Sequence, residues 1–233
     1  MRSHNVCVSV PAGDSLELAG RPSKIFKKRH VHLAIAALMT IMAGSAHAAS
    51  VSYFLDQSNL SPSPLPDGIN YLKVTISDGT GGNIDFKVET LAPLTSIATS
   101  GFGIDRFGFN TSQTLTDSNF VLPTTWTNIG AGTMDGFGQF GFRVDTNGAA
   151  NRVSILNFSI KDIANYTVYD YVNLSTGTAG EGNAYFAAHV AGFSTNDPNT
   201  TSGYFGGSTP VPLPAAAWLF GSGLIGLARR RKA

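Results

Sequence analysis

The chain has 233 residues, one cysteine and a formal net charge of +1, and this charge is unevenly distributed. Between Ala49 and Pro210 there are thirteen acidic and six basic residues, whereas the other basic residues lie near the two ends. The acidic body argues against nucleic acid or anionic polymers as its main partner, because phosphate binding needs a basic face. Cys7 lies upstream of the body, so the body forms no internal disulfide.

The N-terminal segment has the three parts of a secretory signal peptide. Residues 24–30 are rich in basic side chains, and residues 31–43 form an apolar stretch of the expected length. Ala46 and Ala48 provide the small residues of a cleavage site. We therefore predict cleavage before Ala49.

The body from residue 51 onward predicts an all-β protein. Short stretches that alternate apolar and polar residues are separated by Gly, Asn, Asp, Ser and Pro, and no amphipathic helical run of useful length is present. This pattern favours an antiparallel β-sandwich of jelly-roll-like type. The expected strands span residues 51–55, 72–77, 84–89, 103–110, 137–145, 153–161, 166–172, 184–193 and 203–205.

The clearest pair of strands spans residues 72–77 and 84–89, with a Gly-rich connection between them. Period-two alternation places the apolar residues of both strands on one face, so we expect an antiparallel hairpin that packs on a core. The proline-rich residues 61–68 form a stiff loop instead of a strand. The apolar face of the hairpin consists of Leu72, Val74, Ile76, Ile84, Phe86 and Val88.

A near-repeat of alternating Gly and Phe occurs in residues 101–110 and again in residues 136–143. Such alternation lays aromatic rings on one face of a strand, while the glycines admit a close neighbour. We predict that the two stretches are paired core strands. The alternative is a platform of rings that stacks on a ligand.

His189 is the only histidine downstream of the predicted cleavage site. This count excludes a His–Cys dyad and a multi-histidine metal site from the exported part, and no G-x-S-x-G sequence occurs. We therefore predict a hydrogen-bonded structural role for His189, no catalytic residue and no enzymatic activity. A pair of carboxylates for glycoside hydrolysis stays open as an alternative, because the sequence does not give the separation between acidic side chains.

Calcium is the cofactor most worth testing, because exported loops rich in Asp and Asn offer hard oxygen ligands. No EF-hand spacing occurs, so we predict no metal site and keep calcium as an alternative. The candidate pairs are Asp78 with Asn83, Asp145 with Asn147, and Asn196 with Asp197.

Several aromatic residues could stack on sugar rings, which gives a carbohydrate-binding module as the alternative function. Burial in a sheet is the other explanation for them. The candidates are Trp126, Tyr166, Tyr169, Tyr171 and Tyr185.

The C-terminal segment combines prolines, an apolar run and a basic end. Prolines at 210, 212 and 214 fix φ and remove backbone donors, so we expect an extended, polyproline-like spacer that joins no sheet. Residues 215–228 carry no charge. As a helix they reach only about 21 Å, against about 30 Å of membrane hydrocarbon, so the span is marginal. The basic residues 229–232 would stay in the cytoplasm, which leaves the body exported.

This order closely resembles the PEP-CTERM sorting signal of Gram-negative bacteria. The resemblance rests on Val211, Pro212, Leu213, Pro214 and Ala215, followed by an apolar run with Trp218 and by the basic Arg229, Arg230 and Arg231. Leu213 stands where the eponymous motif has Glu. The resemblance implies recognition by an exosortase, a membrane-embedded cysteine protease that removes the tail, and a link to exopolysaccharide and biofilm. The alternative is an ordinary tail anchor.

We therefore expect three segments. Residues 1–48 are a signal peptide whose first part is either an extended basic region or the product of a misassigned start. Residues 49–208 are the exported β-sandwich, and residues 209–233 are a transmembrane sorting helix. The expected function is that of an exported envelope or matrix protein, anchored in the inner membrane by its C-terminus and then processed by an exosortase.

Overall fold

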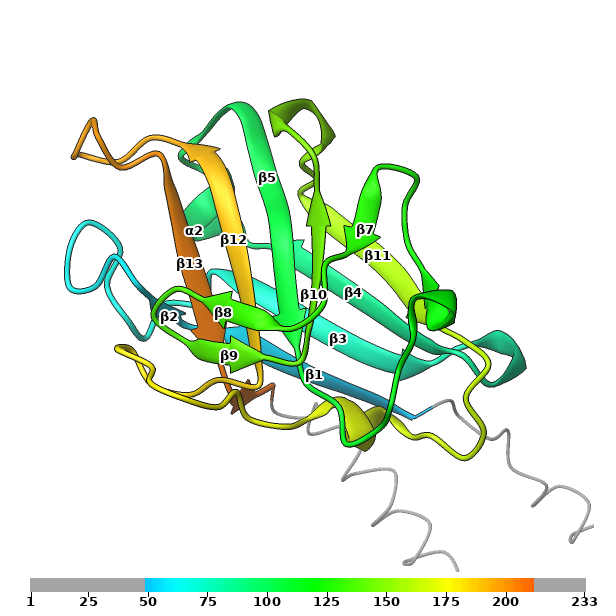
Figure 1. Cartoon of the computed structure of the whole chain (residues 1–233). Coiled ribbons are helices and arrows are strands. Elements are labelled where there is room, and N and C mark those ends of the chain that lie inside the picture. Colours follow the sequence, from blue (N-terminus) through cyan, green and yellow to red (C-terminus); the bar gives the residue numbers. More distant parts are fainter. Residues whose placement is uncertain (1–48, 212–233) are drawn as a thin grey trace, which may run out of the picture. The chain divides into compact units, whose positions relative to one another are not determined.

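The computed structural model describes residues 49–211, which form a sandwich of two antiparallel sheets (Figure 1). Sheet A contains, in spatial order, β14 (Thr209–Pro210), β1 (Ser50–Leu55), β3 (Leu72–Asp78), β4 (Ile84–Thr90), β11 (Ile155–Ile160) and β6 (Phe120–Val121). Sheet B contains β2 (Gln57–Ser58), β13 (Ser202–Gly207), β12 (Phe186–Phe193), β5 (Ala98–Phe109), β10 (Phe142–Thr146) and β7 (Trp126–Asn128).

Smaller elements lie outside the two sheets. A separate hairpin consists of β8 (Gly132–Met134) and β9 (Gly138–Phe140). The helices are short: α2 (Ala92–Thr95) and the 3₁₀ turns Thr80–Gly82, Asp117–Asn119, Ala149–Asn151 and Val168–Tyr171.

The prediction of an all-β, antiparallel sandwich is confirmed. The jelly-roll type stays a prediction. Three neighbouring strands of sheet A, β1, β3 and β4, form an antiparallel meander. After β4 the chain crosses between the sheets several times: β5 lies in sheet B, β6 in sheet A, β7 and β10 in sheet B, β11 in sheet A, and β12 and β13 in sheet B. It ends in sheet A with β14. The two ends of the described domain therefore lie in one sheet.

The hairpin predicted from alternation is present as β3 and β4, paired with Val74 opposite Val88 and Ile76 opposite Phe86. Every member of its predicted apolar face is buried. The face meets the inner side of sheet B, where Phe107, Phe109 and Phe186 project from β5 and β12. Phe86 stacks on Phe158 of β11 with ring centroids 4.6 Å apart, and it also contacts Phe109. Burial of such apolar surface is the main favourable contribution to folding.

The Gly/Phe near-repeat is only partly a pair of core strands. Phe109 of β5 lies opposite Phe142 of β10, as predicted. The prediction of one strand over residues 137–145 is wrong, because the strand is interrupted at Gly141. The Gly141 N–H donates to the Asn110 side chain at 2.6 Å. The part before the break, β9, leaves the sheet and pairs with β8.

The β8–β9 hairpin covers part of the outer face of sheet B, on the side away from the main core (Figure 1). Met134, Phe137 and Phe140 form a second small core there with two alanines of the sheet region. Gly206 and Gly108 leave the room for this layer: a Cβ on Gly206 would overlap the Phe137 ring, and one on Gly108 would lie 3.1 Å from the Phe140 ring. Close approach, and not backbone freedom, explains these two glycines.

The strand predicted over residues 166–172 is also wrong, because a 3₁₀ helix occupies Val168–Tyr171. The Asp170 carboxylate accepts hydrogen bonds from the Thr167 N–H at 2.8 Å and the Thr167 hydroxyl at 3.0 Å. The bond from the Thr167 N–H is the main reason that the pKa of Asp170 lies below its usual value. Local bonding of this kind favours a helical turn over a strand.

Within residues 49–211, no helix is long and apolar enough to cross a membrane. The predicted anchor at residues 215–228 lies outside the described residues, as does the predicted signal peptide.

Candidate functional site

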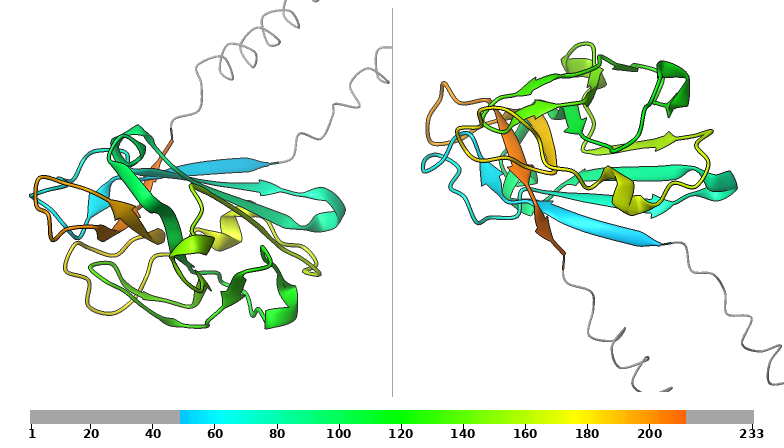
Figure 2. Two further views of the ribbon diagram at one scale, coloured as in Figure 1. Left: turned by 90° about the horizontal axis from the view of Figure 1, so that it is seen from above. Right: turned by 60° about the horizontal axis from the view of Figure 1, so that its bottom comes forward.

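The last strand of the domain lies at the edge of sheet A, beside the first strand (Figure 2). In β14, Thr209 lies opposite Phe54 and Pro210 lies opposite Tyr53. The N–H of Val211 then donates to the Ser52 carbonyl at 2.9 Å. The Thr209 hydroxyl adds a bond of 2.8 Å to Asp56.

The expectation that the prolines keep this segment out of any sheet is therefore wrong at Pro210. A proline is tolerated on an edge strand when its missing N–H faces solvent. Because Val211 directs its N–H toward β1, Pro210 directs its ring nitrogen away from it. The sheet thus extends up to the residues that the sequence assigned to a free spacer.

The start of the domain is held by the neighbouring strand. The N–H of Ala49, the predicted first residue after cleavage, donates to the Asp78 carboxylate at 2.8 Å. The Ala49 carbonyl accepts from the Asp78 N–H at 2.9 Å. The regular sheet therefore begins directly after the predicted cleavage site, with β1 at Ser50.

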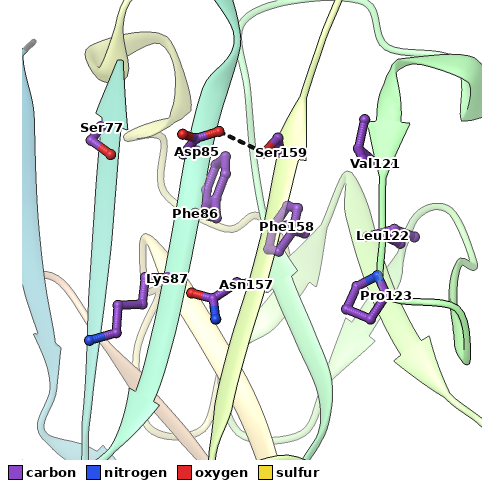
Figure 3. A pocket seen from close by; sticks show the side chains of 10 residues that line it. All are labelled: Ser77, Asp85, Phe86, Lys87, Val121, Leu122, Pro123, Asn157, Phe158 and Ser159. Atoms are coloured by element: carbon purple, nitrogen blue, oxygen red, sulfur yellow. Dashed lines mark hydrogen bonds between the residues drawn. The ribbon is translucent and has the colours of Figure 1, made fainter. Parts of the chain in front are cut away.

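An open groove of about 450 Å³ lies on the outer face of sheet A (Figure 3). Its floor has two rows of polar side chains set by the strand register: Ser77, Asp85 and Ser159 in one, and Lys87 beside Asn157 in the other. Residues 121–123 form an apolar wall, in which Val121 is 47% exposed.

Hydrogen bonds orient the groove side chains. Ser159 donates to Asp85 at 2.6 Å, and Lys87 donates to Glu89 at 2.6 Å. Among residues 49–211, no hydrogen bond engages the side-chain amide of Asn157, which is exposed. The Asp85 carboxylate and the Asn157 amide therefore face one open groove, and such groups can bind hydroxyl groups. Lys87 lies at the margin of the groove, with its ammonium group bonded to Glu89.

A second polar cluster lies on the outer face of sheet B and includes His189. The pairing of β5 with β12 shifts register between His189 and Val190, so that both Asp105 and Arg106 project outward between the buried Ile104 and Phe107. A bulge has this effect because it places two residues opposite one.

In this cluster, the His189 Nδ1 lies 2.5 Å from one Asp105 carboxylate oxygen, and the Arg152 Nε donates to the other at 3.0 Å. Burial alone would raise the pKa of Asp105, but the hydrogen bond and charge of His189 and the charge of Arg152 together lower it. Arg106 donates through Nε to Asp145 at 2.6 Å and through a terminal nitrogen to the Tyr204 hydroxyl at 3.3 Å. The functional groups are thus engaged with one another.

The acidic residues of the candidate calcium pairs have other partners in the structure. Asp145 pairs with Arg106, Asp78 holds Ala49, and Asp197 closes its own turn by accepting from the Thr200 hydroxyl at 2.7 Å. Within the described part of the chain, no group of three or more His, Cys, Asp or Glu side chains is placed to hold a metal ion.

The aromatic residues considered as an alternative for sugar stacking do not form one exposed platform. Trp126 and Tyr171 are only 4% and 0% exposed and belong to the core, whereas Tyr169 is 66% exposed. Tyr166 and Tyr185 are half-buried and pack on the core. Sequence reasoning missed the sheet A groove, because its lining residues are ordinary solvent-side positions in the strand pattern.

The segment from residue 210 to residue 232 matches the PEP-CTERM protein-sorting motif. No curated protein and no solved structure matches the chain. The chain is thus a protein with a C-terminal PEP-CTERM sorting motif, which agrees with the resemblance seen in the sequence. The motif implies export, a membrane-anchored sorting signal and an exosortase as processing partner.

The structure places only the first of the predicted sorting residues. Val211 is bound to β1, as described above, and Ala49 of the predicted signal cleavage site is bound to Asp78. The other predicted residues lie outside the described range: Ala46, Ala48, Pro212, Leu213, Pro214, Ala215, Trp218, Arg229, Arg230 and Arg231.

Proposed function

We propose that this protein is an exported, non-enzymatic β-sandwich protein of the cell envelope or extracellular matrix. Its C-terminal segment holds it in the inner membrane until an exosortase removes that segment. The observation that carries the proposal is the sorting motif at residues 210–232, which begins inside the last strand of the folded domain. The protein would therefore be delivered as a complete domain whose only processed parts are its two ends.

The experiment is an intact-mass measurement on the protein isolated from its native host and from the same host without its exosortase. We expect the mature protein to lack Arg229, Arg230 and Arg231, and the strain without exosortase to retain them. A mature protein that still contains Lys232 in the native host would contradict the proposal.

The non-enzymatic part of the proposal is supported by the cluster around His189. Its histidine, carboxylates and guanidinium groups bond to one another across β5, β10 and β12 and bind together the outer face of sheet B. This is the arrangement of a structural ion network. We further propose that exopolysaccharide is the surrounding material in which the processed protein resides.

A second candidate function is carbohydrate binding, and the sheet A groove favours it. Asp85 and Asn157 can exchange hydrogen bonds with sugar hydroxyls, and the wall at Val121 offers an apolar surface to a ring. In this case the binding surface is the polar groove, and not the aromatic platform that the sequence suggested.

A pull-down with purified exopolysaccharide from the native host tests this second function, with and without a calcium chelator. If the groove binds the polymer, Asp85→Asn and Asn157→Ala should each weaken binding on the order of tenfold, the effect of losing one hydrogen bond of about 1.4 kcal/mol. Lys73→Ala, on the same sheet face but outside the groove, serves as the control. Equal binding by all three variants would exclude the groove.

A further inference from the structure

We propose that the pairing of β14 with β1 is an inhibitory contact that shields the start of the sorting motif, and that β14 must leave β1 before the exosortase can bind the motif. This inference rests on the proposed function, since it concerns the same processing step. It assigns to the edge of β1 a role as the docking strand for the chain's own processing segment.

The first step of the argument is that the motif and the domain share residues. Pro210 and Val211 are the first two residues of the matched motif. Pro210 lies opposite Tyr53 of β1, and the Val211 N–H donates to the Ser52 carbonyl. A protease commonly binds an extended substrate by adding it as a strand. The N–H of Val211 cannot serve an enzyme while it is bonded to Ser52.

The second step is that the proline spacing suits this docking. Pro210 sits in β14 with its ring nitrogen away from β1, whereas Thr209 and Val211 are the residues that bond to the domain. Pro212 and Pro214 follow at the same two-residue spacing in the sequence. Within the described residues, Pro210 therefore removes no hydrogen bond from the pairing of β14 with β1.

The third step is that the pairing of β14 with β1 can open easily. β14 has two residues, both are exposed, and it lies at the edge of its sheet. Short, exposed edge elements with few buried contacts are the first to open in a folded protein. The rate of processing should therefore scale with the fraction of molecules in which β14 is released.

A disulfide that locks β14 to β1 tests the proposal. The exported part has no cysteine, so an introduced pair has no competitor. Phe54 and Thr209 lie opposite each other, and Thr209 precedes the matched motif by one residue. The spacing of about 5.5 Å between Cα atoms that is usual for such a bonded antiparallel pair suits a disulfide. The variant is Phe54→Cys with Thr209→Cys, expressed in the native host.

A matched control shares one of the substitutions. Phe54 also lies opposite Lys73 of β3, so Phe54→Cys with Lys73→Cys fixes β1 to β3 and leaves β14 free. We expect the locked variant to be processed at least tenfold more slowly than this control, as measured by pulse-labelling and intact mass. Treatment of the exported precursor with a reductant should restore processing to the rate of the control.

The outcomes separate the two proposals. Processing of the oxidised, locked variant at the control rate would overturn the inhibitory contact while the proposed function stands. Failure of the disulfide to form in the exported protein would overturn it too, because β14 would not be docked. If the wild type and the control both retain residues 229–231, the proposed function fails, and the inhibitory contact fails with it.

Discussion

His189 and Asp105 are 84 positions apart in the chain, yet the His189 Nδ1 lies 2.5 Å from the Asp105 carboxylate. The two side chains meet because a bulge in β5 turns Asp105 to the same outer face as His189 on β12. Arg152 completes the group by bonding to the second carboxylate oxygen. All three side chains are only about a fifth exposed, so their mutual bonds are partly protected from water.

This relationship predicts how stability depends on pH. The pKa of Asp105 is lower in the folded protein than in the unfolded chain, so its contribution is complete above the unfolded value of about 3.9 and is lost as pH falls through the folded value. Asp105→Asn should cost about 1–3 kcal/mol at neutral pH, because His189 and Arg152 lose a charged partner. Urea unfolding at neutral pH and at pH 3 measures both effects.

The cost of Asp105→Asn should shrink as the pH approaches 3. Asp162→Asn is the control, because the Asp162 side chain is 74% exposed and should change little at either pH. An equal loss of stability at both pH values would show that the Asp105 charge contributes nothing.

Because the β8–β9 hairpin approaches sheet B closely, we predict that Gly206 does not tolerate a larger side chain. Gly206→Ala should destabilise the domain by about 1–3 kcal/mol or more, because the new methyl group would overlap the Phe137 ring and push the hairpin outward. Gly180→Ala should be close to neutral, since a Cβ there has no heavy atom within 4 Å. Thermal unfolding of the two variants measures the difference, and similar melting temperatures would contradict the packing.

Two buried tyrosines should respond in opposite ways to loss of the hydroxyl group. The Tyr71 hydroxyl donates to the Pro66 carbonyl at 2.6 Å, and burial raises the pKa of Tyr71 to about 12. The Tyr171 hydroxyl is buried with no hydrogen-bond partner within the described residues, and burial raises its pKa as well. Tyr71→Phe should therefore cost about 1–2 kcal/mol, whereas Tyr171→Phe should be neutral or stabilising by about 1 kcal/mol.

Chemical denaturation of Tyr71→Phe and Tyr171→Phe under identical conditions measures the pair. Each variant is the control for the other, since both keep the ring in the core. Equal losses of stability would show that the Tyr171 hydroxyl has a partner after all.

The N-terminal prediction concerns Ala49 and Asp78. Cleavage before Ala49 would leave a positively charged amino group at the place where the Ala49 N–H now contacts the Asp78 carboxylate. N-terminal sequencing of the exported protein should read from Ala49, and a product that still contains Lys24 would overturn the signal-peptide assignment. Asp78→Asn should lower the stability of the processed protein by no more than about 1 kcal/mol, because an exposed ion pair contributes little.

The fold was predictable where a pattern is local. Alternation of apolar and polar residues in β3 and β4 predicted the hairpin and the face that it buries in the core. The same reasoning failed over residues 166–172, where Thr167 and Asp170 bond within one turn, and over residues 137–145, where Gly141 bonds to Asn110. In both stretches the apolar pattern of a strand is present, but a side-chain to backbone bond decides the conformation.

Of the candidate functional sites, only the C-terminal sorting motif was predictable from the sequence. The sorting motif is a contiguous stretch with a fixed order of parts, so the residues by themselves are enough to identify it. The groove on sheet A draws its lining from four strands and a loop, and the signal for each residue alone is that of a solvent-facing position. Only the strand register brings Asp85, Ser159 and Asn157 to one place.

By itself, the sequence determined the all-β class, the absence of cysteine between residues 49 and 211, and the sorting motif at residues 210–232. Each of these depends on composition or on neighbours a few positions apart. The tertiary structure decided that His189 meets Asp105, that a hairpin covers Gly206, and that Val211 docks on Ser52. These contacts join residues far apart in the chain, and their geometry depends on strand register and bulges that no local pattern encodes.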